Sequence, residues 1–486
     1  MESSLTKTGY EAGLNDYVNQ ERAAVDLINS VGSLMYDKGV ELVLFRNHLV
    51  NVTISEVINL IGYAKNVVKK PIDLYTSAEI ARAMLKLDLA PSKIDIGKLT
   101  KEYTDGKSSF DSINDFLTSK LGKFIGQDKH NFDPKDVILY GFGRIGRLVV
   151  RELITQAGKG QQLRLKAIVL RKVNEEELVK RAALLSNDSV HGSFKGSVIV
   201  DKENLSLNIN GQRIQFIQAA NPDEIDYTSH GIENALLIDS TGVFTDAEAL
   251  GRHLKSKGVA KVLLTAPGKG IPNIVYGINQ GEFDIEKENI YSAASCTTNA
   301  ISPILKVIED NLEVVKGHIE TIHAYTNDQN LLDNFHKKPR RGRSAAINMV
   351  ITSTGAGNAV TKVIPTLSGK LTANAVRVPT PNGSLAILNL TVNKATSVEE
   401  VNKLINTAAL SGELVNQINY QINPELVSND IIGNNCPSVF DSQATIASAD
   451  GKTITLYAWY DNEYGYTKQV IRLAKHIAKV RRLIYY

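Results

Sequence analysis

A glycine-rich turn directly after a short apolar run constrains this sequence more than any other local feature. The run is Asp136–Tyr140 (DVILY), and an apolar helix is predicted over Arg147–Ala157. In such a unit the first glycine permits a tight turn, the second lets the backbone approach a pyrophosphate, and the third allows close helix–strand packing. N–H groups at the helix start then bind the phosphates. This position favours a dinucleotide-binding turn over an ordinary one, with candidate cofactor residues Gly141, Gly143, Arg144, Ile145 and Gly146.

Apolar runs alternate with helical stretches after this turn. Such alternation predicts a mostly parallel sheet with right-handed crossovers, whose further strands are Leu165–Leu170, Ala235–Ile238 and Lys261–Leu264. Beyond Cys296 the runs lengthen, which predicts a second domain with a mixed or antiparallel sheet built from His318–Ala324, Leu385–Val392 and Thr453–Trp459. The fold class is therefore an α/β Rossmann domain joined to an α+β domain.

The first ~130 residues have a different pattern. Apolar residues recur at helical spacing in Ala23–Leu34 and Val52–Val67, and Thr76–Leu87 begins with a reasonable helix start. Tyr103–Asp133 is polar and is predicted to be a linker. Residues 1–132 are therefore predicted to form a helical N-terminal extension, which carries no nucleotide or metal motif.

Length, charge and cysteine content exclude several classes of protein. The chain has 486 residues, too many for one compact core, and its formal charge of +3 gives no reason to expect nucleic acid or a membrane as partner. Its two cysteines form neither a disulfide framework nor a metal motif. The start of the sequence lacks signal-peptide character, and no run of about 18 apolar residues occurs. A reducing cytoplasm is the simplest compartment.

The end of the second predicted strand leaves the choice of cofactor open. An Asp or Glu is expected there to bind the adenosine ribose, but the strand runs into Arg171 and Lys172. A carboxylate would repel a 2′-phosphate, whereas Arg171 accepts one, so the pattern favours NADP or tolerance of both NAD and NADP. The alternative is that these are solvated charges and that Asn174 or a backbone group binds the ribose.

Cys296 is the candidate nucleophile. It lies in Ser292-Ala293-Ala294-Ser295-Cys296-Thr297-Thr298-Asn299, after a strand-like segment and before a helix predicted to begin near Ile301. The positive end of a helix dipole lowers the pKa of a thiol, so a thiolate is expected. Cys436 lacks comparable surroundings and is interpreted as structural. His323, at the end of a predicted strand, is the candidate base, although a histidine in that position alone is more often a core residue.

Several ordered motifs carry a resemblance to one family. SAASCTTN, HAYTNDQ, RRGRSAA, TSTGAGNAV, RVPTPNGS and WYDNEYGY follow the glycine turn and STGVFTD, from about Val137 to the end of the chain. In order and spacing they resemble glyceraldehyde-3-phosphate dehydrogenases. The resemblance implies a Rossmann domain over 133–295 completed by a C-terminal helix over 463–486, a catalytic domain over 296–462, and a homotetramer. It also implies phosphorylating oxidation of the triose phosphate.

The resemblance also implies roles for individual residues. Cys296 matches the nucleophile and His323 its base, and no metal is implied. Thr326 and Arg377 match the site for the substrate phosphate. Residues matching the site for inorganic phosphate are Ser295, Thr297, Arg341, Thr354 and Gly355. Asn462 matches the residue that orients the nicotinamide, with Tyr466 nearby, and the turn with Gly242 and Thr245 matches the cofactor cleft.

Departures from the family pattern leave other functions open. Ala293, Ala300 and Tyr464 replace the usual Asn, Cys and Trp, and none of them carries covalent chemistry. One alternative is an erythrose-4-phosphate dehydrogenase, which shares the scaffold. Another is a catalytically silent regulatory or scaffolding relative with a partner-binding N-terminal extension. That extension is expected to gate the site, alter the oligomer, bind a partner protein or simply pack on the core. The glycolytic or gluconeogenic direction stays open.

Overall fold

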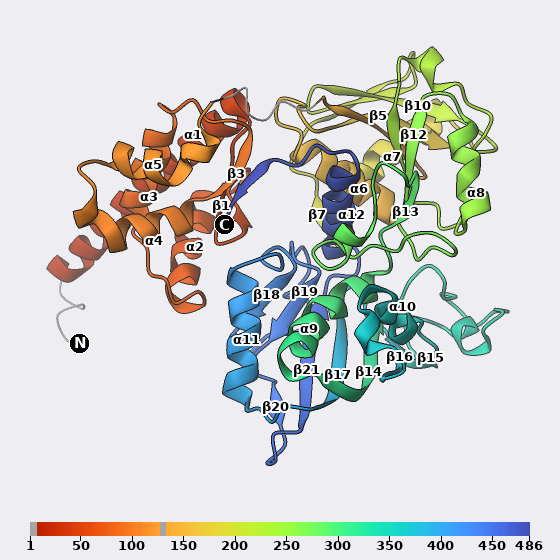
Figure 1. Cartoon of the computed structure of the whole chain (residues 1–486). Helices are drawn as coiled ribbons and strands as arrows, with labels where there is room; N and C mark the ends of the chain where they lie inside the picture. The colour runs from red at the N-terminus through yellow and green to blue at the C-terminus, as the bar shows by residue number, and fades with distance from the viewer. Residues whose placement is uncertain (1–6, 127–132) are drawn as a thin grey trace. The chain divides into compact units, whose positions relative to one another are not determined.

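The computed structural model describes residues 7–126 and 133–486, which divide into two compact units. The first unit combines the chain up to Asp133 with Gly158–Gln161 and Arg481–Tyr486. The second unit contains Pro134–Ala157 and Gln162–Val480. The start of the sequence (residues 1–6) and a stretch near the end of the predicted linker (residues 127–132) lie outside the described residues. The first unit therefore includes segments from three distant parts of the sequence (Figure 1).

Helices make up most of the first unit, as the sequence predicts. The predicted helices correspond to α1 (Lys7–Lys38), α2 (Ile54–Asn66) and α3 (Leu74–Met84). Helix α2 begins with a capping box, in which Thr53 and Glu56 satisfy each other's backbone N–H groups. The predicted linker Tyr103–Asp133 is wrong in part, because the end of α4 (Ile96–Gly106), η2 (Lys107–Ser109), α5 (Ile113–Leu121) and η3 (Gly122–Phe124) all fall in it.

The first unit also contains a small sheet that sequence patterns missed. Its order is β2-β1-β3-β22, formed by β1 (Glu41–Leu44), β2 (Asn47–His48), β3 (Ser92–Asp95) and β22 (Leu483–Tyr485). These strands have two to four residues, too few to show an alternating pattern. β22 pairs in parallel with β3, and Arg482 beside it forms a buried ion pair with Glu41 of β1. The last residues of the sequence thus complete the fold of the first unit.

In the second unit, the predicted Rossmann sheet is confirmed. Its order is β13-β12-β11-β4-β5-β10-β9-β8, and the six strands from β13 to β10 pair in parallel. The glycine turn links β4 (Lys135–Tyr140) to α6 (Arg144–Thr155). The remaining elements are β5 (Leu163–Leu170), α7 (Glu175–Ser186), β8 (Val198–Asp201), β9 (Ser206–Ile209), β10 (Gln212–Gln218), β11 (Ala235–Asp239), α8 (Ala247–Gly251), β12 (Val259–Leu264) and β13 (Ile290–Ser292). A short hairpin of β6 (Asn187–Asp188) and β7 (Gly192–Ser193) follows α7.

The second sheet of this unit is mixed, which also agrees with the sequence. Its order is β15-β16-β14-β17-β21-β19-β18, with β20 (Ile446–Ala447) beside β21. The strands are β14 (Val314–Ala324), β15 (Val350–Thr352), β16 (Leu371–Val378), β17 (Ser384–Val392), β18 (Ile418–Gln421), β19 (Ser438–Asp441) and β21 (Thr453–Tyr460). Its helices are α9 (Cys296–Leu312), α10 (Ala356–Val363) and α11 (Val398–Leu410). The C-terminal helix α12 spans only Tyr464–Ile477, because β22 follows it.

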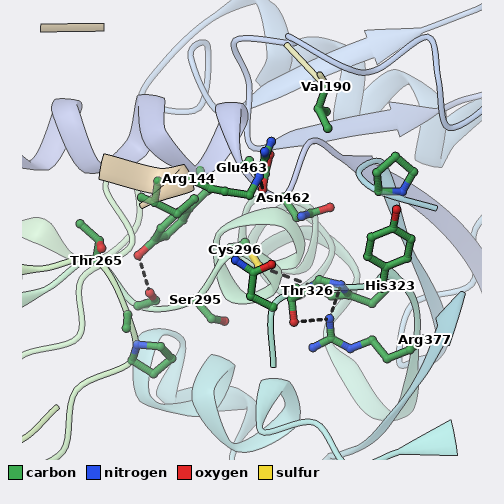
Figure 2. A pocket seen from close by; sticks show the side chains of 18 of the residues that line it. Arg144, Val190, Thr265, Ser295, Cys296, His323, Thr326, Arg377, Asn462 and Glu463 are labelled. Carbon is green, nitrogen blue, oxygen red and sulfur yellow. Dashed lines mark hydrogen bonds and ion pairs between the residues drawn. The ribbon is translucent and has the colours of Figure 1, made fainter. Parts of the chain in front are cut away.

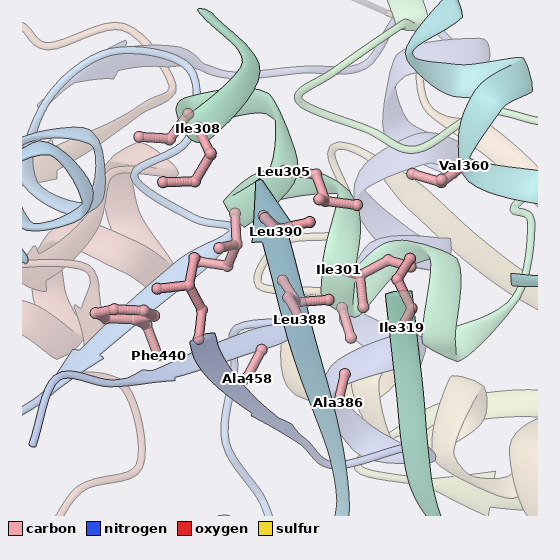
Figure 3. Packing of buried hydrophobic residues seen from close by; sticks show 14 of the residues in the cluster. Ile301, Leu305, Ile308, Ile319, Val360, Ala386, Leu388, Leu390, Phe440 and Ala458 are labelled. Atoms are coloured by element: carbon pink, nitrogen blue, oxygen red, sulfur yellow. The ribbon is translucent and has the colours of Figure 1, made fainter. Parts of the chain in front are cut away.

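A buried apolar layer fixes α9 against the mixed sheet (Figure 3). Ile301, Leu305 and Ile308 of α9 pack with Leu388 and other alternating residues of β17, all fully buried. Burying a side chain of this size stabilises the fold by about 1.5–3 kcal/mol. Because Cys296 is the first residue of α9, this layer also fixes the position of the thiol.

Among residues 7–126 and 133–486, no helix has both the length and the apolar character needed to cross a bilayer.

Candidate active site

A cavity of about 560 Å³ in the second unit brings together nine of the residues selected from the sequence (Figure 2). Helix α9 contributes Cys296, with Ser295 just before it, and β14 contributes His323. The other six are Arg144, Ile145, Thr326, Arg377, Asn462 and Tyr466. Both domains of this unit therefore line a single cavity, with the thiol and the imidazole on its wall.

Cys296 is placed by the cap of its own helix. The Ser295 side chain accepts a hydrogen bond from the backbone N–H of Thr298, which makes it the N-cap. Helix α9 therefore begins at Cys296, five residues before the predicted start near Ile301. The preceding Ala294 has a left-handed φ of 55°, uncommon for a residue with a Cβ. The Tyr466 hydroxyl donates to the Ala294 carbonyl oxygen at 2.9 Å, which supports this turn.

Cys296 and His323 face each other across 3.7 Å between Sγ and Nε2. His323 Nδ1 lies 2.7 Å from the carbonyl oxygen of Ala324, an acceptor, and 3.0 Å from Arg377 Nη1, a donor. The guanidinium already donates to the Ala324 carbonyl oxygen, and the shorter contact of Nδ1 is with that acceptor, so we assign the ring proton to Nδ1. Nε2 is consequently the lone-pair nitrogen, and it faces the thiol. This geometry suits transfer of the thiol proton to His323.

Burial of Cys296 opposes the thiolate that is expected from its position at a helix start. Burial raises the pKa of the thiol above its usual value, although the Arg377 charge and hydrogen bonds from Thr297 oppose the shift. Burial, followed by the positive charge of Arg377, lowers the pKa of His323 to about 3. Without substrate, a neutral thiol and a neutral imidazole therefore face each other at neutral pH. The expectation from the helix dipole left out burial, which is the largest influence on the pKa of this thiol.

Arg377 of β16 lies directly behind His323. Its Nη1 donates to the Ala324 carbonyl oxygen at 2.8 Å and lies 3.5 Å from the Thr326 hydroxyl. Burial, and then the charge of Arg341, lower the pKa of Arg377. Its Nε is buried without a hydrogen-bond partner among the described residues. A buried guanidinium with unused donors beside a threonine hydroxyl is suited to an anionic group.

The residues matched to inorganic phosphate do not all line this cavity. Ser295 does, whereas buried Thr297 hydrogen-bonds the Tyr460 hydroxyl at 3.1 Å. Arg341 Nε donates to Thr352 at 3.0 Å, and its Nη1 pairs with Asp328. Thr354 Oγ1 accepts from the Ala356 N–H at the start of α10, whose N-cap is Gly355. Arg341 is thus paired with a carboxylate, a neighbour that sequence reasoning missed.

The glycine turn has the close backbone packing that its sequence predicts. Gly141 has φ +96°, and a Cβ there would lie 2.9 Å from the Thr241 side chain. A Cβ on Gly146 would lie 2.7 Å from the Gly141 carbonyl oxygen. Gly143 is the N-cap of α6. It has no side chain to accept hydrogen bonds from the first N–H groups of the helix, so these groups are left for a ligand.

The Arg144 side chain is already paired with two carboxylates. It donates to Glu463 Oε2 at 2.6 Å and to Asp188 Oδ1 at 3.2 Å, and His191 Nε2 lies 2.9 Å from Glu463. Burial raises the pKa of Glu463, but bonds from Arg144 and His191 outweigh it and hold that pKa below its usual value. A cofactor that contacts Arg144 would therefore share this side chain with the carboxylates of Asp188 and Glu463. Glu463 could have been found, since it follows Asn462 within the WYDNEYGY motif.

The other cofactor candidates lie outside this cavity lining. Arg171 and Lys172 are exposed just beyond the end of β5, as expected for residues at a strand terminus. Gly242 has φ +70°, and the Thr245 carbonyl oxygen accepts a hydrogen bond from the Lys269 N–H. Within the described residues, no cluster of three or more metal-ligating side chains occurs.

The fold and the site together indicate the class of protein to which this chain belongs. A doubly wound domain with a glycine turn, joined to an α+β domain that presents a cysteine beside a histidine, is typical of NAD(P)-dependent oxidoreductases that act on aldehydes. The NAD-binding domain model of glyceraldehyde 3-phosphate dehydrogenase matches residues 135–247, and the C-terminal domain model matches residues 295–462. The chain therefore belongs to the glyceraldehyde-3-phosphate dehydrogenase family, and its cofactor is NAD or NADP.

Relatives support this assignment. A glyceraldehyde-3-phosphate dehydrogenase-like protein of Pseudomonas aeruginosa is 46% identical over 93% of this chain and 98% of its own length. The glyceraldehyde-3-phosphate dehydrogenase of Priestia megaterium is 39% identical over 70% of this chain and 96% of its own. The chloroplastic form A of Zea mays is 40% identical over 75% of this chain and 88% of its own. The similarity to the Pseudomonas protein thus extends beyond the two family domains.

Proposed function

We propose that this protein oxidises D-glyceraldehyde 3-phosphate and phosphorylates the product to 1,3-bisphosphoglycerate. One observation carries the proposal: Cys296 Sγ lies 3.7 Å from the lone-pair nitrogen of His323 in a cavity that Arg377 and Asn462 also line. A nucleophile, its base, a cation for a phosphate and an amide for a cofactor are the groups that this reaction requires.

The turn and the amide fit a dinucleotide. The open N–H groups at the start of α6 suit a pyrophosphate, and the packing at Gly141 and Gly146 leaves no room for a Cβ there. Asn462 lines the cavity, and its Nδ2 has no hydrogen-bond partner among the described residues. When bound, the nicotinamide supplies the hydride acceptor. Asn462 would hold its carboxamide, and Tyr466 would pack beside it.

The protein residues carry the covalent and proton-transfer steps. Cys296 Sγ attacks the aldehyde carbon while the thiol proton passes through His323 Nε2 to the carbonyl oxygen, which gives a hemithioacetal and leaves His323 neutral. His323 then removes the hydroxyl proton as the carbon is oxidised, leaving a thioester on Sγ. Inorganic phosphate attacks this thioester and frees the thiol and the acyl phosphate. Arg377 and Thr326 would hold the substrate phosphate throughout.

Bound substrate would also change the pKa of the base, His323. The charge of Arg377 is the second cause of the low pKa of His323, after burial. A bound phosphate beside Arg377 would offset that charge and raise the pKa of His323 towards the range in which it exchanges protons at neutral pH. The same phosphate would therefore both position the aldehyde and adjust its base.

The attacking phosphate requires a second anion site. We assign it to Arg341 with Ser295, Thr297, Thr354 and Gly355. Arg341 is the anchor, because its guanidinium is mostly buried and already binds an oxyanion, the Asp328 carboxylate. Inorganic phosphate would compete with that carboxylate for the same donors.

We propose that both cofactors are accepted and that Arg171 binds the 2′-phosphate of NADP. Arg171 and Lys172 place two exposed cations at the end of β5, where an acidic residue would exclude this phosphate. Arg171→Ala should raise the KM for NADP with little change in the KM for NAD. Lys180→Ala, an exposed cation on α7, is the control. Equal losses for both cofactors would refute the role of Arg171.

Domain limits and assembly are proposed from the same resemblance. The Rossmann domain is assigned to 133–295 and the catalytic domain to 296–462. We infer a homotetramer from the family resemblance, and one segment offers apolar side chains suited to an interface: Leu331, Leu332, Phe335, Ile347 and Met349 are all exposed. Phe335→Asp should lower the mass measured by sedimentation. A reducing cytoplasm suits the free Cys296 thiol, and a protein partner is proposed for the first unit.

Steady-state kinetics test the proposed reaction directly. Purified protein should reduce NAD or NADP with D-glyceraldehyde 3-phosphate, depend on inorganic phosphate, and prefer this aldehyde to erythrose 4-phosphate. Cys296→Ser should abolish turnover, whereas Cys436→Ser, the matched control at a buried cysteine outside the cavity, should retain it. Preference for the tetrose, or absence of any Cys296-dependent activity, would overturn the proposal in favour of the corresponding alternative.

A further inference from the structure

Ser384 connects the two halves of the proposed site although it does not line the cavity. It is the first residue of β17 and is fully buried. Its Oγ accepts the backbone N–H of Ala324 at 3.1 Å and donates to Asn462 Oδ1 at 2.8 Å. Ala324 follows His323 on β14, and Asn462 immediately precedes Glu463, the N-cap of α12. One hydroxyl therefore holds both the strand of the base and the cofactor amide.

The direction of these bonds determines which atom Asn462 offers to the cavity. A serine hydroxyl has one proton and two lone pairs. The Ala324 N–H occupies one lone pair, and the proton goes to Asn462 Oδ1. The amide oxygen is thereby engaged, so that Nδ2, which has no partner among the described residues, is left for a ligand.

We propose that Ser384 is a positioning residue that fixes the amide of Asn462, so that its NH₂ group donates to the nicotinamide carboxamide oxygen. The nicotinamide is thereby held with one face towards Cys296. This inference rests on the proposed function and deepens it. Without the Ser384 hydroxyl, Asn462 is free to rotate by half a turn about its last bond, and either end of the amide meets the cofactor.

Kinetics of Ser384→Ala, Asn462→Ala and the double variant test this role. Each single variant should raise the cofactor KM by about 10-fold, which corresponds to about 1.4 kcal/mol, a typical cost of losing one buried hydrogen bond. In the Asn462→Ala background, Ser384→Ala should have no further effect on this KM, because the two act as a unit. Additive effects on KM would overturn the inference.

Stereochemistry separates positioning from general stability. With substrate deuterated at the aldehyde carbon, the parent protein should place deuterium on one face of the reduced nicotinamide. Ser384→Ala should place it on both faces, and an unchanged single-face product would contradict the proposal. If Ser384→Ala does not fold, the variant Asn462→Asp provides the test of the inference instead. It keeps the acceptor for Ser384 but loses the NH₂ donor, so cofactor affinity should fall at unchanged melting temperature, and retained affinity would refute the inference.

The outcomes distinguish this inference from the proposed function. If Asn462→Ala leaves the cofactor KM unchanged, the assignment of Asn462 itself is wrong. If Asn462→Ala raises the KM while Ser384→Ala does not, the assignment of Asn462 stands and the positioning role of Ser384 is refuted.

Discussion

Replacing Arg482 with methionine keeps most of the aliphatic stem of this side chain but removes the charge that faces Glu41. The two side chains are 4% and 7% exposed, and Arg482 Nη1 lies 3.2 Å from Glu41 Oε2. Leaving one partner of a buried ion pair uncompensated typically costs 3–5 kcal/mol. Glu41 retains Lys93 at 3.3 Å and His48 at 2.6 Å, so we expect the lower end, about 3 kcal/mol.

Hydrogen exchange measured by mass spectrometry gives a local readout of this change. A loss of about 3 kcal/mol should speed exchange that occurs through opening of the first unit by about 100-fold, in peptides covering β3 and α4. Peptides of the Rossmann domain serve as an internal reference. Arg82→Met is the matched control, because Arg82 pairs with Asp26 at 2.7 Å but both side chains are more than half exposed. That variant should lose at most about 1 kcal/mol.

The pH dependence supplies an independent check on the same pair. Burial raises the pKa of Glu41, but the charges of Lys93, His48 and Arg482 outweigh it and hold the pKa well below its usual value. A depressed carboxyl pKa contributes stability that is present above the unfolded-state pKa and is lost as pH falls through the folded value. The difference between Arg482→Met and the parent should therefore shrink in acid. Equal exchange in Arg482→Met and Arg82→Met at neutral pH would refute the reasoning.

Three further predictions concern the second unit. Asp328→Asn should lower the KM for inorganic phosphate several-fold in steady-state kinetics, because the carboxylate competes for Arg341; an unchanged or raised KM would contradict this. Arg377→Leu should shift the pH profile of Cys296 alkylation further upward, because the Arg377 charge lowers the pKa of that thiol; a downward shift would show that the sign is wrong. Leu388→Ala should cost about 2–5 kcal/mol in denaturant unfolding, and a loss below about 1 kcal/mol would show that the layer in Figure 3 repacks.

Local sequence was enough to predict those helices, strands and turns whose apolar or glycine pattern is complete within a few residues. Helices α1 and α2 follow from apolar spacing and α3 from a helix-start signal, and β4, β5 and β11 follow from apolar runs long enough to stand out. The glycine turn was identifiable because Gly141 and Gly146 meet steric demands of the backbone itself. Cys296 was found because it lies in a turn of polar and small residues, and His323 was found because such a nucleophile needs a base. Strands of two to four residues, such as β1 and β3, carry too short a signal.

Tertiary structure alone decided which distant groups meet and how they are charged. Arg144 and Glu463 are 319 positions apart, and Ser384 and Asn462 are 78 apart, so no local pattern pairs them. The Arg482–Glu41 pair and the addition of β22 to the first unit have the same origin. The raised pKa of Cys296 also depends on the fold, since burial is its largest cause. Sequence specifies local conformation and reactive groups, whereas burial and long-range contacts set their partners and protonation, because both depend on how the whole chain packs.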